Sequence, residues 1–152
     1  MSSDKYLFQA IVEQVSNAII FADRQGVIRL WNAGAEAVFG YSSEEVIGQS
    51  LDVIIPERLR PAHWKAFDKA VETGRTKYGR QVMVTSSIHK TGKKLYVDLS
   101  FAIVSDGSGE VVGAAAVASD ATERYLAEAA LRKQVAELEA QLKTASAPPS
   151  PG

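Results

Sequence analysis

The segment from Asn32 to Gly48 constrains the fold more than any other feature, because it encodes two short helices separated by a tight corner. The Asn32 side chain is of the type that caps a helix N-terminus, since its oxygen can accept hydrogen bonds from free backbone N–H groups. The apolar residues that follow share one helical face: Ala35, Val38 and Phe39. Gly40 then stands where a helix C-terminus favours a left-handed residue. A short helix ending at Gly40 is therefore expected.

A second helix is expected directly after this corner. Ser42 and Glu45 have the spacing of a capping box, in which each side chain accepts a hydrogen bond from the other residue's backbone N–H. The order along the chain is then a strand signal, an Asn-capped helix, Gly-Tyr-Ser, an acidic helix and Ile-Gly. Far downstream, Asp120-Ala-Thr-Glu-Arg124 follows another strand signal.

Together these residues resemble a PAS domain. The first segment resembles the first half of such domains, and Asp120-Ala-Thr-Glu-Arg124 resembles the Asp-Ile-Thr-type signature that usually closes one. The resemblance covers about residues 5–125. It implies an α+β fold with a five-stranded antiparallel sheet, in the strand order 2-1-5-4-3, and helices on one face. This fold says little about what the domain senses.

Hydrophobic spacing and composition predict four regions. Residues 1–16 have helical apolar spacing and are expected to form an N-terminal helix. Residues 17–121 are expected to form the PAS domain, and residues 122–143 a C-terminal signalling helix. Residues 144–152 are rich in Pro, Ser and Ala and are expected to be disordered.

Several elements are expected inside the domain. A helix can begin at Pro61 and run to about Thr73. Within residues 94–103, apolar and polar residues alternate, which is typical of a sheet with one buried face. The predicted strands are 18–22, 27–31, 78–88, 94–103 and 111–119.

The C-terminal helix carries an apolar stripe. Leu131, Val135, Leu138 and Leu142 are spaced 4, 3 and 4 residues apart, as in a coiled-coil seam. An isolated helix of this length is marginal in water, so the stripe needs a partner. Either the helix folds back on its own domain, or it pairs in a homodimer. Because the N-terminal helix also carries apolar residues, a homodimer through either helix or both is expected.

Composition excludes several classes of function. The net charge of −1 gives no general basic field for a nucleic acid or an anionic membrane, and Arg75, Lys77 and Arg80 are interpreted as solvated edges. No apolar run approaches the roughly 18 residues of a membrane span, and no signal peptide is visible, so a cytoplasmic location is expected. The absence of cysteine excludes the flavin–cysteine photoadduct of light-oxygen-voltage PAS proteins. No catalytic motif is present, so no enzymatic activity is expected.

His63 is the candidate metal ligand. It lies early in the predicted helix and shares the apolar stripe of Ala66, Phe67, Ala70 and Val71. A neutral imidazole facing a sheet can be an axial ligand of heme iron. Pro56-Glu57, a following arginine and His63 resemble the proximal-histidine helix of heme-PAS oxygen sensors of the nitrogen-fixation kinase type. This second resemblance implies heme b as the cofactor, with His63 as its ligand.

The other expected pocket residues are Phe67 on the same helix and Met83, Leu99, Phe101 and Ala116 on the strands. Met83 stands at about the position where those sensors have an arginine that steadies bound oxygen. Methionine cannot donate that hydrogen bond, although its thioether could be a sixth iron ligand or only core filling. The alanines around Ala116 leave volume above the sheet, to be filled either by neighbouring side chains or by a planar cofactor or small ligand.

Two functions remain open. The first is a sensory or signal-transduction module in which a ligand or heme acts on the C-terminal helix, and through it on a downstream signalling protein. The alternative is a ligand-free PAS module for dimerisation or protein interaction. In that alternative, Phe67 and Trp64 close the core and His63 bonds to backbone or solvent. His89, in a predicted turn, is expected to be solvated and to have no role.

Overall fold

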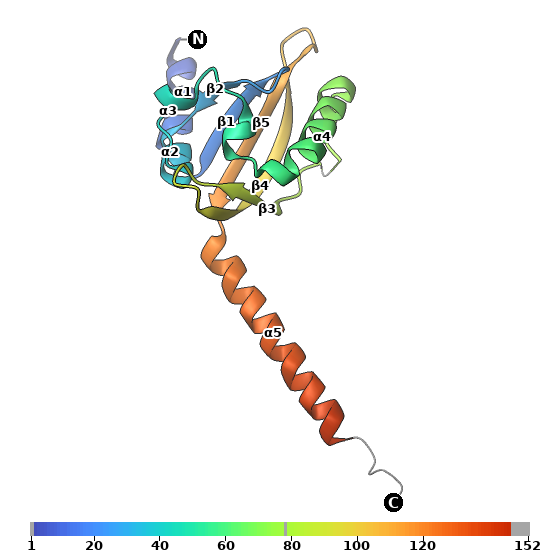
Figure 1. The fold of residues 1–152 in the computed structure, drawn as a ribbon. Helices are drawn as coiled ribbons and strands as arrows, with labels where there is room; N and C mark the ends of the chain where they lie inside the picture. Colours follow the sequence, from blue (N-terminus) through green and yellow to red (C-terminus); the bar gives the residue numbers. More distant parts are fainter. Residues whose placement is uncertain (1, 78, 147–152) are drawn as a thin grey trace, which may run out of the picture. The chain divides into compact units, whose positions relative to one another are not determined.

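A computed structural model of the 152-residue chain describes residues 2–77 and 79–146. Within these residues, five antiparallel strands form one sheet in the order β2-β1-β5-β4-β3. The predicted α+β class and the strand order implied by the PAS resemblance are both confirmed (Figure 1). The strands are β1 (Ala18–Asp23), β2 (Ile28–Trp31), β3 (Met83–Ile88), β4 (Lys94–Ser105) and β5 (Val111–Asp120).

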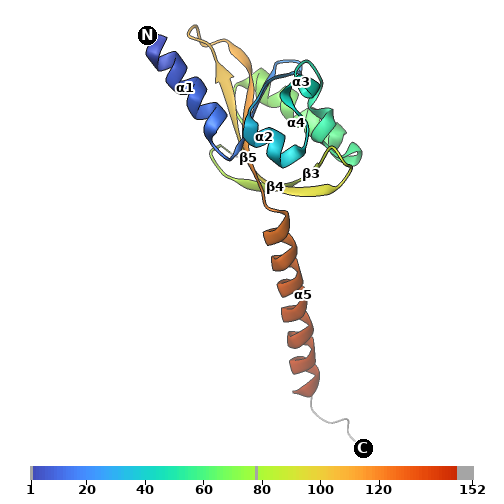
Figure 2. The ribbon, with the colours of Figure 1, turned by 90° about the vertical axis from the view of Figure 1, so that its left-hand side faces the viewer.

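Helices connect and cover these strands. Figure 2 shows α2, α3 and α4 on one side of the sheet and α1 on the other. The helices are α1 (Ser2–Gln14), α2 (Ala33–Phe39), α3 (Ser43–Val46), the 3-10 helices η1 (Leu51–Ile54) and η2 (Glu57–Leu59), α4 (Arg60–Thr73) and α5 (Thr122–Ala145).

The chain divides into two compact units, one ending at Ala121 and the other beginning at Thr122. In the described residues of the second unit, helix α5 continues through Thr144 and Ala145. Residues 147–152 of the predicted disordered tail lie outside the described residues. In the described part of the chain, no helix combines the length and the apolar character that a membrane span requires.

The segment after β2 folds as its caps predict. Asn32 accepts a hydrogen bond from the Ala35 N–H at 2.9 Å, and α2 ends at Gly40, whose φ is +83°. Ser42 and Glu45 form the reciprocal capping box, with N···O distances of 3.3 and 3.0 Å. The predicted helix–corner–helix arrangement is confirmed.

Asn32 does more than cap α2. It is fully buried, and its side-chain oxygen also accepts a hydrogen bond from the Ile19 N–H at 2.8 Å. Its amide group donates to the carbonyl oxygens of Val12 at 2.7 Å and Asn17 at 3.0 Å. One side chain therefore joins the end of α1, the start of β1 and the start of α2.

One predicted strand begins too early. The strand expected over residues 78–88 starts only at Met83 in β3. Gly79 has a left-handed φ of +59°, and its carbonyl oxygen accepts a hydrogen bond from the Thr76 hydroxyl at 3.4 Å. A left-handed residue interrupts an extended chain, so Gly79 and Arg80 form a turn and the strand begins only after it.

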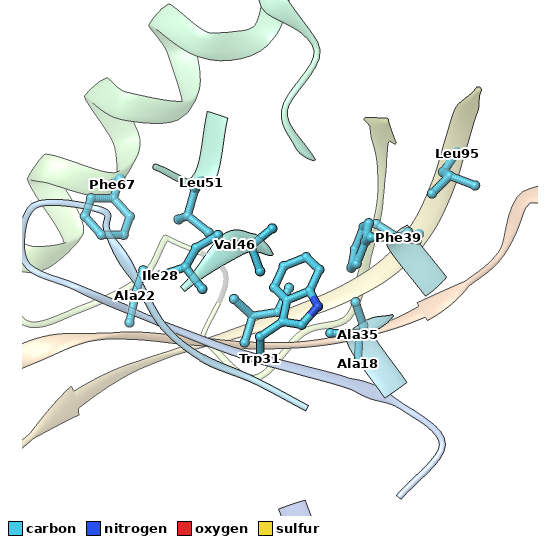
Figure 3. Packing of buried hydrophobic residues seen from close by; sticks show 14 of the residues in the cluster. Ala18, Ala22, Ile28, Trp31, Ala35, Phe39, Val46, Leu51, Phe67 and Leu95 are labelled. Carbon is cyan, nitrogen blue, oxygen red and sulfur yellow. The ribbon is translucent and has the colours of Figure 1, made fainter. Parts of the chain in front are cut away.

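The core lies between the sheet and the helices that cover it. Figure 3 shows Phe67 at the edge of this cluster, pointing from α4 toward the sheet. On β4, Leu95 and Val97 are buried as the alternating pattern predicts. Leu99 and Phe101 are only partly buried, because they border a hollow beneath α4. The fully buried side chains of largest volume are Phe39, Ile28, Val46, Val97 and Asn32.

Candidate functional site

A cavity of about 360 Å³ lies between α4 and the sheet. Its walls come from β1, α2, η1, α4 and the three strands β3, β4 and β5. The structure brings all the side chains expected at the cofactor site to this one space: His63, Phe67, Met83, Leu99, Phe101 and Ala116. Apolar side chains from a helix and facing strands therefore enclose a volume large enough for a small molecule.

His63 is the ionisable residue of these walls, and it lies in the first turn of α4. Its Nδ1 atom is buried and has no hydrogen-bond partner among the described residues. Burial lowers the pKa of His63 below its ordinary value, against the opposing effect of the Asp52 and Asp68 carboxylates. The imidazole is therefore neutral at neutral pH, which is the form that binds metals.

The ring of His63 lies among aromatic side chains of the same helix. Its centroid is 4.8 Å from Trp64, edge to face, and 6.0 Å from Phe67 with the rings 30° apart. These contacts restrict the orientation of the imidazole. A buried polar atom without a partner is uncommon in folded proteins, so the Nδ1 atom calls for an explanation.

Trp64 fixes α4 to the rest of the domain. Its indole N–H donates to Asp52 Oδ1 at 2.7 Å, and Arg60 donates to the Asp52 carbonyl oxygen at 3.2 Å. The indole ring also lies directly over Gly26, where an added Cβ would come within 2.2 Å of it. Trp64 thus anchors the helix to η1 and to the β1–β2 turn and is not part of the cavity wall.

The alanines of β5 form part of the cavity floor. Ala116 pairs with Phe101 of β4, and Ala114 pairs with Ile103. Both alanines border the cavity, whereas Ala118 is fully buried against the core. These alanines leave volume above the sheet, and neighbouring side chains such as Phe67 fill only part of it, so that the cavity remains.

Polar groups border the cavity at the β3 side. The Ser87 hydroxyl donates to the Ile54 carbonyl oxygen at 2.6 Å and so ties β3 to η1. Gln81 and Thr85 also line the wall, together with the partly buried Met83. The sequence analysis did not name these polar residues, although Thr85 and Ser87 follow Met83 at the spacing of two that places residues on one face of a strand.

A second hollow, of about 600 Å³, adjoins the first. The residues shared by both walls are His63, Phe67, Thr76, Phe101 and Ala114. The second wall also contains Lys69, Arg75 and Lys77. Arg75 and Lys77, interpreted from the sequence as solvated edges, are exposed and also border this hollow.

His89 is not the freely solvated residue that the sequence suggested. It is partly buried, and its ring packs against Gly40, where an added Cβ would lie 2.5 Å from the ring. Its Nδ1 atom lies 2.9 Å from the Thr91 hydroxyl oxygen. The residue does not border either hollow and contributes to the packing of the β3–β4 turn on the end of α2.

The family comparison agrees with this geometry. The family model described as a PAS fold matches residues 12–126. The chain therefore belongs to the PAS family, whose members include sensory domains.

Two curated relatives are sensors. The chain is 29% identical to the oxygen sensor protein DosP of Escherichia coli (strain K12) over 104 residues, which cover 68% of the chain and 13% of DosP. It is 36% identical to the sensor protein FixL of Bradyrhizobium diazoefficiens over 55 residues, which cover 36% of the chain and 11% of FixL. The chain thus spans only about an eighth of the length of these relatives.

Solved structures show the same fold. The PAS domain of a protein from Colwellia psychrerythraea is 26% identical, with a TM-score of 0.68 over 80% of this chain and 98% of that one. An RNA-binding light-oxygen-voltage receptor is 19% identical, with a TM-score of 0.74 over 90% of this chain and 38% of that one. At 19% identity, the second likeness concerns the fold alone.

Proposed function

We propose that this chain is a sensory PAS domain that holds heme b through His63 and passes the state of its ligand to α5. The observation that carries the proposal is the buried, unpartnered Nδ1 atom of a neutral histidine that borders an apolar cavity. The similarity to DosP, whose name describes an oxygen sensor, supports the same proposal. We assign the domain no catalytic step and propose that it acts in the cytoplasm.

The residues around the cavity fit a heme. An apolar wall suits the flat porphyrin, and a neutral imidazole suits the iron. His63 would hold the heme iron, and Phe67, Leu99, Phe101 and Ala116 would hold the porphyrin. When bound, the heme would supply an iron centre whose redox or gas-binding state can change. Met83 would either bind the iron as well or form part of the apolar wall.

The route to α5 would begin at the last strand. β5 carries Ala114 and Ala116 of the cavity floor and ends at Asp120. Ala121 is buried, and its N–H donates to the Tyr96 carbonyl oxygen of β4 at 2.8 Å. Only this residue separates β5 from Thr122, the first residue of α5. A shift of β5 would therefore act on the first turn of α5 without an intervening flexible linker.

The second candidate function is a ligand-free PAS module that dimerises. The observation that favours it is the exposed apolar surface of both terminal helices, since such surfaces usually mark interaction sites. On α1, Tyr6, Leu7 and Phe8 are each more than half exposed. A homodimer is compatible with both functions, so the cavity and not the oligomeric state distinguishes them.

The visible spectrum tests the proposal. The protein would be purified from heme-supplemented cells, and a Soret band is expected. His63→Ala should lose the band, because it removes the proposed iron ligand. The matched control is His89→Ala, which alters the other histidine of the chain and should keep the band. Met83→Leu would change the shape of the spectrum if the thioether is an iron ligand and leave it unchanged if Met83 is only part of the wall.

A colourless protein that also fails to take up added hemin would end the heme proposal and favour the dimerisation module. A Soret band that survives in His63→Ala but disappears in His89→Ala would also contradict it. Native mass spectrometry of the purified chain would then show whether the cavity carries another non-covalent ligand.

A further inference from the structure

The two adjoining hollows differ in chemical character. The first is bordered mainly by apolar side chains, among them Ile20, Leu51 and Leu99. The second continues from it along His63, Phe67 and Phe101 and reaches the basic residues at the end of α4. An apolar space therefore opens toward a group of cations. A molecule that fills both would need an apolar body and a polar end.

The charges around the second hollow have one sign. Lys69 and Arg75 belong to its wall, and neither wall contains an aspartate or a glutamate among the described residues. Asp68 and Glu72 lie on the same helix as Lys69 but do not border either hollow. In residues 2–77 and 79–146, neither Lys69 nor Arg75 forms an ion pair. Lys69 and Arg75 therefore border the hollow, and no carboxylate in the described part of the chain borders it with them.

We propose that Lys69 and Arg75 form a carboxylate subsite, so that the cavity takes an amphipathic ligand with its apolar body under α4 and its carboxylate at the end of the helix. Both side chains are exposed at the mouth of the hollow, and a guanidinium and an ammonium both donate charge-assisted hydrogen bonds to carboxylate oxygens. The carboxylate can come from an acyl chain or from a porphyrin. This inference rests on the proposed function, because it requires that the cavity holds a ligand.

The first test compares decanoate with decan-1-ol by isothermal titration calorimetry on the heme-free 152-residue chain. Both share the apolar chain, and only decanoate carries a carboxylate. Decanoate should bind the wild type more tightly, and in Lys69→Gln/Arg75→Gln its affinity should fall about tenfold. The affinity for decan-1-ol should stay unchanged, which also shows that the variant is folded. A higher salt concentration should weaken the binding of decanoate and leave the binding of decan-1-ol unchanged, because salt screens only the interaction of the charged ligand.

The matched control is Arg58→Gln/Lys65→Gln. It removes the same two positive charges from exposed residues next to and on α4 that do not border the hollows. Decanoate should bind this variant as tightly as it binds the wild type. An equal loss in both double variants would show a general charge effect and overturn the subsite.

The second test distinguishes the two sources of carboxylate by comparing the retention of hemin and hemin dimethyl ester. If a porphyrin is the ligand, hemin should dissociate about tenfold faster from Lys69→Gln/Arg75→Gln than from the wild type, and the ester should not. The subsite is supported if the wild type prefers the probe that carries a carboxylate, in either pair of probes, and if Lys69→Gln/Arg75→Gln abolishes this preference.

No such preference in either pair would overturn the subsite, even if hemin binds through His63. Conversely, binding of decanoate that depends on Lys69 and Arg75 would stand even if the chain never takes up hemin. The failure of the subsite and the failure of the heme proposal are therefore distinguishable.

Discussion

At the scale of single residues, the burial of His63 makes the stability of the domain depend on pH. The pKa of His63 is lowered in the folded chain, whereas in the unfolded chain it is about 6.5. As the pH falls below about 6.5, the unfolded chain binds a proton that the folded chain does not, so the free energy of unfolding decreases. The stabilising contribution is complete above the unfolded pKa and is lost below it.

We therefore expect His63→Phe to reduce this acid sensitivity. In the heme-free protein, the free energy of unfolding should fall less steeply for the variant than for the wild type between about pH 7 and about pH 5. Urea unfolding followed by circular dichroism at several pH values would measure both slopes. Equal slopes would contradict the assignment of a buried, neutral His63.

Gly26 is the residue whose replacement should most directly disturb the anchor of α4. It has a left-handed φ of +78° and lies beneath the Trp64 ring. In Gly26→Ala, the new methyl group would overlap that ring, in addition to the strain of the left-handed backbone. We expect a loss of about 2–4 kcal/mol in the free energy of unfolding.

Gly92 provides a matched control for this prediction. It also has a left-handed φ, +86°, and its N–H also closes a turn, but an added Cβ would meet nothing within 4 Å. Gly92→Ala should therefore lose only about 1 kcal/mol, the cost of backbone strain. Thermal and urea unfolding would compare the two variants, and an equal loss in both would show that Trp64 moves aside without cost.

At the scale of secondary-structure elements, Asn32 connects three of them. It should therefore contribute more to the free energy of unfolding than an ordinary helix cap does. Asn32→Ala removes two acceptor and two donor hydrogen bonds from a buried site. Because the partner backbone groups of α1, β1 and α2 would be left unsatisfied, we expect a loss of about 3 kcal/mol. Ser42→Ala, which removes the more exposed cap of α3, should lose about 1 kcal/mol. Urea unfolding that gave equal losses would contradict the role of Asn32 as a connection between elements.

Elements defined by local signals could be predicted from the sequence. Asn32, Gly40 and the Ser42–Glu45 capping box act within a few residues of one another, so their spacing alone indicates the helices. The start of β3 was predicted too early, although Gly79, which has a left-handed φ, is itself a local signal of a turn. The order of the strands came from the PAS resemblance, since pairs such as β1 with β5 join residues far apart in the sequence.

The residues of the first cavity could be predicted from the sequence, whereas the second hollow could not. The side of α4 that carries His63 and Phe67 follows from helical spacing, and the small side chains of β5 indicate unfilled volume. The second hollow was missed, because Lys69 and Arg75 meet there only through the irregular chain after Gly74. No pattern of residues along the sequence marks such a path.

At the scale of the whole molecule, the terminal helices carry apolar surface that the single chain leaves exposed. On α5, Leu131, Val135, Leu138 and Leu142 are 60%, 51%, 52% and 69% exposed, so each member of the predicted seam is available for a partner. On α1, Phe8 is 66% exposed. A homodimer would bury these side chains, and it remains a prediction that the oligomeric state can test.

We expect the chain to be a dimer by multi-angle light scattering at micromolar concentration. If α5 forms the interface, Leu138→Asp should dissociate the dimer, because it places a charge in the apolar seam. Ala140→Asp is the matched control: it adds the same charge to α5 at the position opposite the seam and should leave the dimer intact. If α1 forms the interface, Phe8→Asp should dissociate the dimer and Leu138→Asp should not. A monomeric wild type, or a dimer that survives both Leu138→Asp and Phe8→Asp, would contradict the prediction that the terminal helices join two copies of this chain.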